Sequence, residues 1–321
     1  MALIYFYDTT ELDKQQITNA LSGTDHHWEY VDEQLSIENI NPETEVLSVF
    51  VTSSVTAEII EALPKLRLIA CRSTGFNNVD LQAAGQRNIV VENVPTYGEQ
   101  TVAEFAFTLL LALSRKLPES IKSFDNDTPT ENMRGWDLKG KKLGVIGTGH
   151  IGQCAIKIGK GFSMDVIAYD PFPNEKVAKE LGYTYVSLDE LFSQSDAITI
   201  HAPYFPSNHH LVNSEKLALM KPTSVLVNTA RGELIDTKAL TEAMAKKQIA
   251  GVALDVIEGE QLMHLDEEVA LLRGVDRPKT ELLQHSLELM ALHKMPNVIL
   301  APHNAFNTIE AIGRINTVTC E

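Results

Sequence analysis

The sequence predicts an α/β fold built on parallel sheets, and three observations lead to this expectation. Short β-branched runs alternate with amphipathic helical stretches, which is typical of parallel sheets with helical crossovers. A polar, loop-rich stretch at 123–134 interrupts the alternation, which then starts again at residue 142. The first run of this second series leads directly into a glycine-rich turn. We therefore expect two α/β units.

The first series predicts three strands and three helices. The strands are expected where β-branched and other apolar residues cluster, at 45–51, 66–70 and 89–92. The helices are expected between and after these runs, at 56–63, at 80–86 and from about residue 100 to residue 115.

The second series predicts six further strands and a last helix from about residue 308. The strands are expected at 142–146, 165–169, 197–201, 224–228, 251–255 and 299–301. The chain shows no internal repeat and no low-complexity tract, so the two series are not copies of one motif.

The length and composition of the chain fit a globular protein of two domains. Its 321 residues are 44% hydrophobic and 22% charged, which is enough apolar material for a sizeable core, and one domain per ~150 residues is the loose expectation. The 43 acidic residues exceed the 27 basic ones and give a net charge of −16. This charge argues against a nucleic-acid or an anionic-membrane partner.

Neither a membrane span nor a secretion signal is expected. The apolar stretch 105–113 is too short to cross a bilayer and is closed by Arg115 and Lys116. The N-terminal residues lack the positive flank and the cleavage site of a signal peptide. The three scattered cysteines fit neither a disulfide framework nor a thiolate metal site. A reduced, cytoplasmic protein is the resulting prediction.

The glycine-rich turn has the spacing of a dinucleotide-binding loop. Residues 142–152 read KLGVIGTGHIG, an apolar strand followed by three spaced glycines. These glycines allow a tight turn, close approach of a pyrophosphate and close packing of the next helix on the strand. The N-terminus of that helix then presents free N–H groups to the phosphates. The loop residues expected to bind the cofactor are Gly147, Gly149, His150, Ile151 and Gly152.

Asp170 ends the second strand of this series, 23 residues after Gly147. An acidic residue about 20 residues beyond the loop is expected to bind the adenosine ribose. Strand, loop, helix and carboxylate together predict NAD, and NAD rather than NADP, because a 2′-phosphate would be repelled by the carboxylate. A Rossmann-type methyltransferase is the weaker interpretation, since nothing downstream is typical of a methyl-acceptor site.

Three polar residues follow strand-like runs, where a parallel sheet presents side chains to a crevice. Arg231 lies in VNTARG, Glu260 in LDVIEGE and His303 in LAPHNAF. Taken singly, each residue type is more often structural, as a surface ion pair, a solvated turn carboxylate or a loop histidine. The stretches around them carry more information than the residues alone.

Six stretches form one ordered set, namely STGFNNVD (73–80), ENVPTYGEQTVAEFAFTLLLAL (92–113), GVIGTGHIG (144–152), VNTARGELID (227–236), GVALDVIEGE (251–260) and APHNAFNT (301–308). In this order they resemble the D-isomer-specific 2-hydroxyacid dehydrogenase family, and within it the D-lactate dehydrogenases. The resemblance implies an α/β protein in which a Rossmann NAD-binding domain is inserted into a flavodoxin-like substrate-binding domain. The substrate-binding domain would comprise residues 1–100 and 296–321, and the NAD-binding domain residues 101–295.

The resemblance implies an NAD-dependent enzyme that transfers a hydride reversibly between NADH and a small 2-oxo acid, with pyruvate and D-lactate as the expected pair. His303 would be the general acid and base, because imidazole titrates near working pH. Glu260 would hydrogen-bond the other ring nitrogen and stabilise the imidazolium. Arg231 would hold the substrate carboxylate and polarise the C2 carbonyl, a task that suits the fixed fork of a guanidinium.

Further substrate contacts are implied by the same resemblance. Backbone N–H groups of Thr74-Gly75-Phe76 would form a second carboxylate-binding loop. Tyr97 and Phe306, with Phe50, would wall the apolar side and leave room for a methyl or modest apolar group. Along the nicotinamide half of the cofactor, the residues expected are His201, Ala202, Pro203, Thr229, Ala230 and Asp255.

Two alternatives to this function stay open. The chain could be an NAD(H)-responsive binding or regulatory protein of the same fold, or a dehydrogenase for a larger 2-hydroxy acid. The complete set of Arg231, Glu260 and His303 favours an enzyme, and the glutamate disfavours formate oxidation, for which the family usually has glutamine. A phosphoglycerate substrate would need more cations near the carboxylate loop than Arg72.

No metal site is expected from the sequence. The histidine pairs at 26–27 and 209–210 lack a matching set of ligands and are interpreted as surface residues. The resemblance implies a shorter connection than 261–294 between Glu260 and His303 in most of the family, although lactate-type members also carry an extension there. The segment is expected to form a helical excursion, either as a contact in a homodimer or as a surface elaboration without function.

Overall fold

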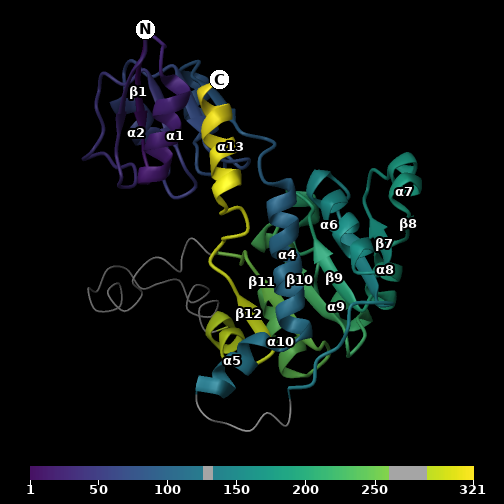
Figure 1. Ribbon diagram of the computed structural model, residues 1–321. Coiled ribbons are helices and arrows are strands. Elements are labelled where there is room, and N and C mark those ends of the chain that lie inside the picture. Colours follow the sequence, from purple (N-terminus) through teal and green to yellow (C-terminus); the bar gives the residue numbers. More distant parts are fainter. Residues whose placement is uncertain (126–132, 260–287) are drawn as a thin grey trace, which may run out of the picture. The chain divides into compact units, whose positions relative to one another are not determined.

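The computed structural model describes residues 1–125, 133–259 and 288–321 (Figure 1). The chain divides into two compact units, Met1–Gly98 with Phe306–Glu321 and Glu99–Ala305. The first unit is therefore built from both ends of the chain, and the second unit is inserted into it. The chain returns to the first unit at Phe306 rather than at the expected residue 296. The reason is that β12 (Val298–Leu300) still pairs within the sheet of the second unit.

The first unit holds a five-stranded, fully parallel sheet in the order β2-β1-β3-β4-β5. This 2-1-3-4-5 order is that of flavodoxin-like folds, as the sequence predicts. Its strands are β1 (Leu3–Phe6), β2 (His27–Tyr30), β3 (Val46–Val49), β4 (Leu68–Cys71) and β5 (Val90–Asn93).

Four helices of the first unit begin at a Thr or Asp whose side chain accepts a hydrogen bond from a backbone N–H of the first turn. Such caps satisfy donors that the helix itself leaves unpaired. At Thr10 the cap is reciprocal, because the carboxylate of Asp13 accepts from the backbone N–H of Thr10. The helices, with their N-caps, are α1 (Glu11–Leu21, Thr10), α2 (Ala57–Ala62, Thr56), α3 (Leu81–Gln86, Asp80) and α13 (Ile309–Cys320, Thr308).

The second unit holds a seven-stranded parallel sheet in the order β12-β11-β10-β9-β6-β7-β8. Counted within the unit, this is 7-6-5-4-1-2-3, the doubly wound Rossmann order with one added edge strand. Its first six strands are β6 (Lys142–Ile146), β7 (Asp165–Tyr169), β8 (Thr184–Tyr185), β9 (Ala197–Ile200), β10 (Val225–Asn228) and β11 (Gly251–Leu254).

The central strands of this sheet are covered on both faces. Every residue of β9, β10 and β11 is buried, which is why these strands read as continuous apolar runs instead of alternating with polar residues. On one face α4 (Glu99–Ser114) packs against α6 (His150–Gly161) and contacts β10 and β11. The other helices are α5 (Leu117–Asp125), α7 (Glu175–Leu181), α8 (Leu188–Gln194), η1 (Pro206–Asn208), α9 (Ser214–Leu219), η2 (Gly232–Leu234) and α10 (Thr237–Ala245).

Two segments that the sequence predicts as a loop and as a helical excursion have a different outcome. The first begins later than expected, and the second lies mostly outside the described residues. The stretch 123–134 was predicted as a loop from its start, but α5 continues to Asp125 and buries Ser123. Most of the predicted excursion 261–294 lies outside the described residues. Residues 288–293 are helical, and Leu289 and Leu292 join the core of the second unit.

Candidate active site

The glycine-rich turn after β6 has the geometry that its spacing predicts. Gly147 has a φ of +89°, a left-handed conformation that residues with a Cβ rarely adopt. A Cβ at Gly147 would lie 2.7 Å from the backbone nitrogen of Ala202, and one at Gly152 would lie 2.0 Å from the carbonyl oxygen of Gly147. The first and third glycines are therefore required by the turn and by the packing of α6.

The second glycine faces open space. No atom lies within 4 Å of a Cβ built at Gly149, which caps the N-terminus of α6 without a side-chain hydrogen bond. The first N–H groups of α6 thus remain available to an anion, and the helix dipole favours a negative charge there. His150 is exposed beside this opening, whereas Ile151 is half-buried and packs against the core.

Asp170 is engaged by the glycine turn itself. Its Oδ2 accepts hydrogen bonds from the backbone N–H (2.7 Å) and the hydroxyl (3.0 Å) of Thr148, and its Oδ1 accepts one from the N–H of Phe172 (2.9 Å). A carboxylate has about four acceptor positions, so about one remains for a ribose hydroxyl. Asp170 therefore orders the loop, and its expected contact with the ribose stays a prediction beside this structural role.

A tyrosine pair extends this network, and the sequence analysis did not anticipate it. The hydroxyl of Tyr185 lies 2.8 Å from that of Thr148 and 2.9 Å from that of Tyr183. Burial is the largest cause of a raised pKa at Tyr183, so the phenol stays protonated. The pair thus supports Thr148, the residue of the glycine turn that Asp170 also contacts.

The other predicted residues of this unit follow four neighbouring strands. Since β9, β10, β11 and β12 are adjacent and parallel, their carboxyl ends lie along one edge of the sheet. His201-Ala202-Pro203 follows β9, Thr229-Ala230-Arg231 follows β10, Asp255 follows β11 and His303 follows β12. The structure thus gathers these residues on the edge at which α/β sheets bind ligands.

Two buried polar atoms at this edge have no hydrogen-bond partner among the described residues. They are Nδ1 of His201 and Oγ1 of Thr229. The other ring nitrogen of His201 lies 3.0 Å from the hydroxyl of Thr199, and burial lowers the pKa of His201 to about 4. Unpaired buried polar atoms are costly, and together with the open Gly149 cradle they fit a polar ligand such as the nicotinamide half of NAD.

Arg231 is presented by a turn that Asn228 shapes. The side chain of Asn228 donates to the carbonyl of Arg231 (2.8 Å) and accepts from the N–H of Ala230 (2.9 Å). The half-buried guanidinium donates to the carbonyl of Ala230 (2.7 Å). Asn228 was not singled out from the sequence, although its place as the last residue of a buried strand marks it as a turn former.

Asp255 fixes the turn that carries His303. Its carbonyl accepts from the N–H of His303 (2.8 Å), and its two carboxylate oxygens accept from the N–H groups of Asn304 (2.7 Å) and Ala305 (2.8 Å). His303 has a φ of +51°, which a residue with a Cβ adopts only where its surroundings hold it. Asp255 is 1% exposed, and its expected contact with the nicotinamide stays a prediction beside this structural role.

Glu260 lies outside the described residues. Glu258 is described two positions earlier, and its Oε1 lies 2.9 Å from Nε2 of His210. No sequence pattern indicates this pairing, because the two residues are 48 positions apart.

In the first unit, the loop after β4 is held by its own polar side chains. Ser73 donates to the carbonyl of Gly75 (2.6 Å), and Thr74 donates to the carbonyl of Val94 (3.0 Å). Phe76 remains 40% exposed. Tyr97 is tied to α13, because Nε of Arg314 donates to its carbonyl (2.6 Å).

Phe50 and Phe306 meet edge to face, with ring centroids 5.3 Å apart. Both line a cavity of about 280 Å³ in the first unit, together with Arg72. Arg72 is 2% exposed, and its guanidinium donates to the carbonyls of Tyr7 and Asp8 and lies 5.7 Å from the centroid of the Phe50 ring. One terminal nitrogen of the guanidinium is thus engaged at the end of β1, whereas its buried Nε has no hydrogen-bond partner among the described residues.

Comparison with known proteins decides the family. The family model "D-isomer specific 2-hydroxyacid dehydrogenase, NAD binding domain" matches residues 107–305. The chain belongs to the D-isomer-specific 2-hydroxyacid dehydrogenase family. It is an NAD-dependent oxidoreductase of D-2-hydroxy acids, as the six sequence stretches predict.

Relatives match over nearly the whole chain. A 2-hydroxyacid dehydrogenase homolog of Haemophilus influenzae is 36% identical over 98% of this chain and 93% of its own. D-lactate dehydrogenase of Escherichia coli is 34% identical over 98% and 94%. A glyoxylate reductase of Korarchaeum cryptofilum is 35% identical over 84% and 76%.

Solved structures agree with this membership. The pyruvate reductase of Chlamydomonas reinhardtii has a TM-score of 0.87 at 33% identity and covers 100% of this chain and 94% of its own. D-lactate dehydrogenase from Aquifex aeolicus, solved with NAD and lactic acid, has a TM-score of 0.82 at 32% identity, covering 99% and 93%. Within the described parts of the chain, no helix has the length and apolar character needed to cross a membrane.

Proposed function

We propose that the chain reduces pyruvate to D-lactate reversibly, with Arg231, Glu260 and His303 as its catalytic residues. The observation that carries the proposal is the order of side chains along one sheet edge. Arg231 follows β10 and His303 follows β12, with Asp255 after the strand between them. The edge thus offers a guanidinium for a carboxylate and an imidazole for a proton.

Each residue has a task that its chemistry suits. Bound NAD supplies or accepts the hydride. In the direction of reduction, the guanidinium of Arg231 binds the substrate carboxylate and draws electron density from the C2 carbonyl. Nε2 or Nδ1 of protonated His303 donates its proton to the C2 oxygen, and Glu260 stabilises that protonated form. In oxidation, the neutral imidazole takes the proton back.

The choice of a small substrate is supported by the first unit. Phe50 and Phe306 pack edge to face. Together with Tyr97, they would form the apolar wall of the substrate site. Thr74-Gly75-Phe76 would supply N–H groups for the carboxylate. A phosphorylated substrate is disfavoured, because Arg72 is buried and donates to backbone carbonyls instead of facing a second anionic group.

Two of the relatives also support the choice, since they are named for D-lactate and pyruvate. Glyoxylate reductase among the matches marks the main competitor. The test is a panel of pyruvate, glyoxylate, 2-oxobutyrate and 2-oxoisocaproate, followed by the loss of NADH absorbance. We expect the highest kcat/KM for pyruvate, and a higher value for glyoxylate or for the branched acid would contradict the assignment.

A regulatory protein that binds NAD(H) without turnover would show cofactor binding and no oxidation in the same panel. The Arg231 turn argues against it, because Asn228 bonds on both sides of that turn to present the guanidinium. We therefore retain the enzyme.

We further propose a cytoplasmic homodimer. The three cysteines are unpaired, and burial raises the pKa of Cys71 to about 11, which keeps that thiol unreactive. Leu117, Ile121 and Phe124 lie exposed at helical spacing on α5 and would suit a subunit contact. Light scattering after size-exclusion chromatography tests the dimer, and a monomeric mass would contradict it.

A further inference from the structure

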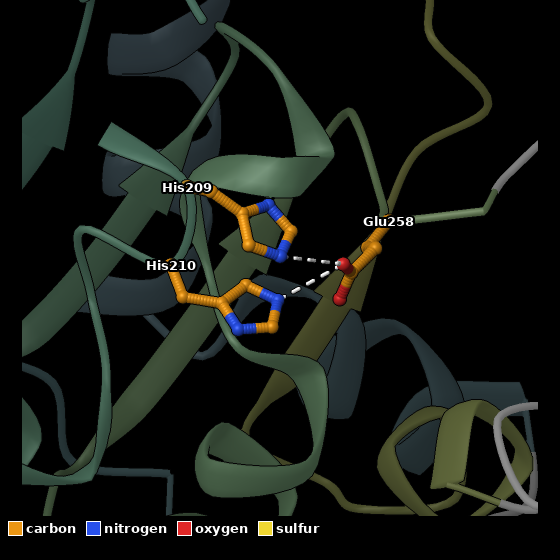
Figure 2. A group of neighbouring side chains, drawn as sticks. All are labelled: His209, His210 and Glu258. Carbon is orange, nitrogen blue, oxygen red and sulfur yellow. Dashed lines mark hydrogen bonds and ion pairs between the residues drawn. The ribbon is translucent and has the colours of Figure 1, made fainter. Parts of the chain in front are cut away.

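Two histidines and a glutamate come together beside the residues assigned above (Figure 2). His209 and His210 follow η1 in the segment after β9, and Glu258 follows β11. Nε2 of His210 lies 2.9 Å from Oε1 of Glu258, and Nε2 of His209 lies 3.9 Å from the same oxygen. One ligand atom from each residue lies within 4.8 Å of the others.

The two imidazoles are arranged alike. Their rings stack with centroids 3.8 Å apart and planes 24° apart, and both direct a nitrogen toward Glu258 (Figure 2). From the sequence alone, this pair is interpreted as surface residues without a matching set of ligands. Both side chains are partly exposed, as expected of surface residues, but folding also brings the carboxylate of Glu258 to them.

The outer nitrogen of each ring also faces an oxygen. Nδ1 of His209 lies 3.5 Å from the hydroxyl of Tyr204, and Nδ1 of His210 lies 4.0 Å from Oδ2 of Asp236. Metal-binding histidines usually direct their second nitrogen to such a group, which holds the proton on that nitrogen and frees the other for the ion. The carboxylate of Asp236 also adds negative charge near the cluster.

We propose that His209, His210 and Glu258 bind a divalent transition-metal ion, with zinc as the preferred ion. Two imidazoles and a carboxylate are a common ligand set for zinc, which completes a tetrahedron with water. Zinc–ligand bonds of about 2.0–2.1 Å place tetrahedral ligand atoms about 3.3 Å apart. The observed separations of 2.9 and 3.9 Å lie on either side of this value.

The site is open to solvent, and its side chains have room to adjust to an ion. The side chains of His209, His210 and Glu258 are 44%, 33% and 26% exposed. The ion can therefore reach them from solvent, and small side-chain rotations equalise the distances. The ion would replace the hydrogen bond between His210 and Glu258.

The ion would join two segments that enclose the Arg231 turn. Gly232, next to Arg231, packs so closely on the second segment that a Cβ there would lie 2.2 Å from the backbone nitrogen of Glu258. A metal link from Glu258 to His209 would restrain both segments around this contact. We expect the site to be structural, and it does not depend on which 2-oxo acid is the substrate.

The test uses tag-free, full-length protein freed of metal with a chelator. Wild type, His209→Asn, Glu258→Gln and the matched control His27→Asn, an exposed histidine of the first unit, are titrated with zinc by calorimetry. We expect one ion per chain in wild type and in His27→Asn. Loss of a direct ligand should weaken binding by more than about tenfold in His209→Asn and in Glu258→Gln.

Two further readouts fix the ligands and control for folding. Cobalt(II) should give visible bands of a four-coordinate site in wild type and lose them in His209→Asn. Zinc should raise the Tm of wild type and of His27→Asn but not of the two site variants. Circular dichroism and NADH binding of the metal-free proteins show whether each variant is folded, and the second site variant serves if the first is not.

Two outcomes would overturn the proposal. One is folded wild-type protein that takes up no zinc. The other is zinc affinity in folded His209→Asn and Glu258→Gln equal to that of wild type, which would place the ion elsewhere on the chain.

Discussion

The backbone carbonyl of Asp255 accepts a hydrogen bond of 2.8 Å from the backbone N–H of His303. The carboxylate of the same residue takes the next two N–H groups of the chain. Three successive backbone N–H groups thus donate to one buried residue, which directly follows the neighbouring strand β11. This arrangement holds the backbone of His303 in its left-handed conformation.

Asp255→Asn should therefore reduce both stability and turnover. An amide offers one acceptor oxygen, so a buried N–H loses its partner at a cost of about 1–3 kcal/mol. Displacing the imidazole by about 1 Å should lower kcat about 10²-fold, while NADH still binds. Urea unfolding and steady-state kinetics measure both effects against Asp165→Asn, an exposed aspartate at the start of β7. Unchanged kcat in Asp255→Asn would show that the hydrogen bonds to Asp255 do not position His303.

His303→Ala should remove the proton transfer and lower kcat about 10²–10⁴-fold. NADH affinity, followed by the cofactor's fluorescence, should change little, because the glycine turn lies on β6 and not on β12. His293→Ala, an exposed histidine, is the matched control and should retain full activity. Turnover above half of the wild-type value in His303→Ala would contradict the assigned role.

Gly147→Ala should weaken NADH binding by roughly tenfold or more. The φ of +89° imposes a strain of about 1–3 kcal/mol on alanine, and about 1.4 kcal/mol corresponds to tenfold in affinity. The added methyl would also press on the backbone of Ala202 at 2.7 Å. Gly161→Ala at the end of α6, where a Cβ meets nothing within 4 Å, should bind NADH normally. Equal affinities for the two variants would rule out the steric argument.

NADH should be preferred over NADPH by tens- to hundreds-fold, on the order of 2–3 kcal/mol. Asp170 would repel a 2′-phosphate, and Asp170→Ala should reduce the preference. Because Asp170 also holds Thr148, this variant disturbs the loop as well. Thr148→Val removes the hydrogen bonds of the hydroxyl but keeps the Asp170 carboxylate. It should weaken the binding of both NADH and NADPH while leaving the ratio of their kcat/KM values unchanged. Equal kcat/KM for NADH and NADPH in the wild-type protein would contradict the role of Asp170.

Stability should fall in mild acid because of His201. Burial lowers its pKa from 6.5 to about 4, so between these values the unfolded chain binds a proton that the folded chain does not. Its contribution is therefore present above pH 6.5 and is lost as the pH falls toward 4. At about 1.36 kcal/mol per unit, the loss between pH 7 and pH 5 should be about 2 kcal/mol. Urea unfolding at both pH values should show a smaller drop in folded His201→Asn, and an equal drop would exclude His201 as the source.

The sequence predicted most strands whose apolar pattern is strong, although β1 (LIYF) was not among the expected strands. β6 and β7 have the expected bounds, since each is a β-branched run closed by a turn. The edge strand β2, HWEY, alternates exposed and half-buried residues and carries polar side chains, so no apolar run marked it. β8 is two residues long, too short to give a pattern at all.

The sequence predicted those parts of the candidate site that a local motif marks. It did not predict the contacts that form only when distant segments fold together. The glycine spacing contains its own geometry, and Gly147 and Gly152 fulfil it. The second roles of Asp170 and Asp255 could not be read from the sequence, because a carboxylate at a strand end looks the same whether it faces a ligand or a backbone N–H. The pairing of His210 with Glu258 depends on the alignment of two strands separated by a third, which no local spacing reveals.

Helix α13 packs against α1 in the first unit, and the side chain of Asn316 donates to Asp13 (2.8 Å), 303 positions away. During synthesis from the N-terminus, the chain must be made beyond residue 316 before this contact can form. The second unit, which is continuous from Glu99 to Ala305, can complete its sheet earlier. Until then, the surface of the first unit that α13 covers remains exposed. Exposed apolar surface promotes aggregation, so this is the interval in which the growing chain most needs protection from it.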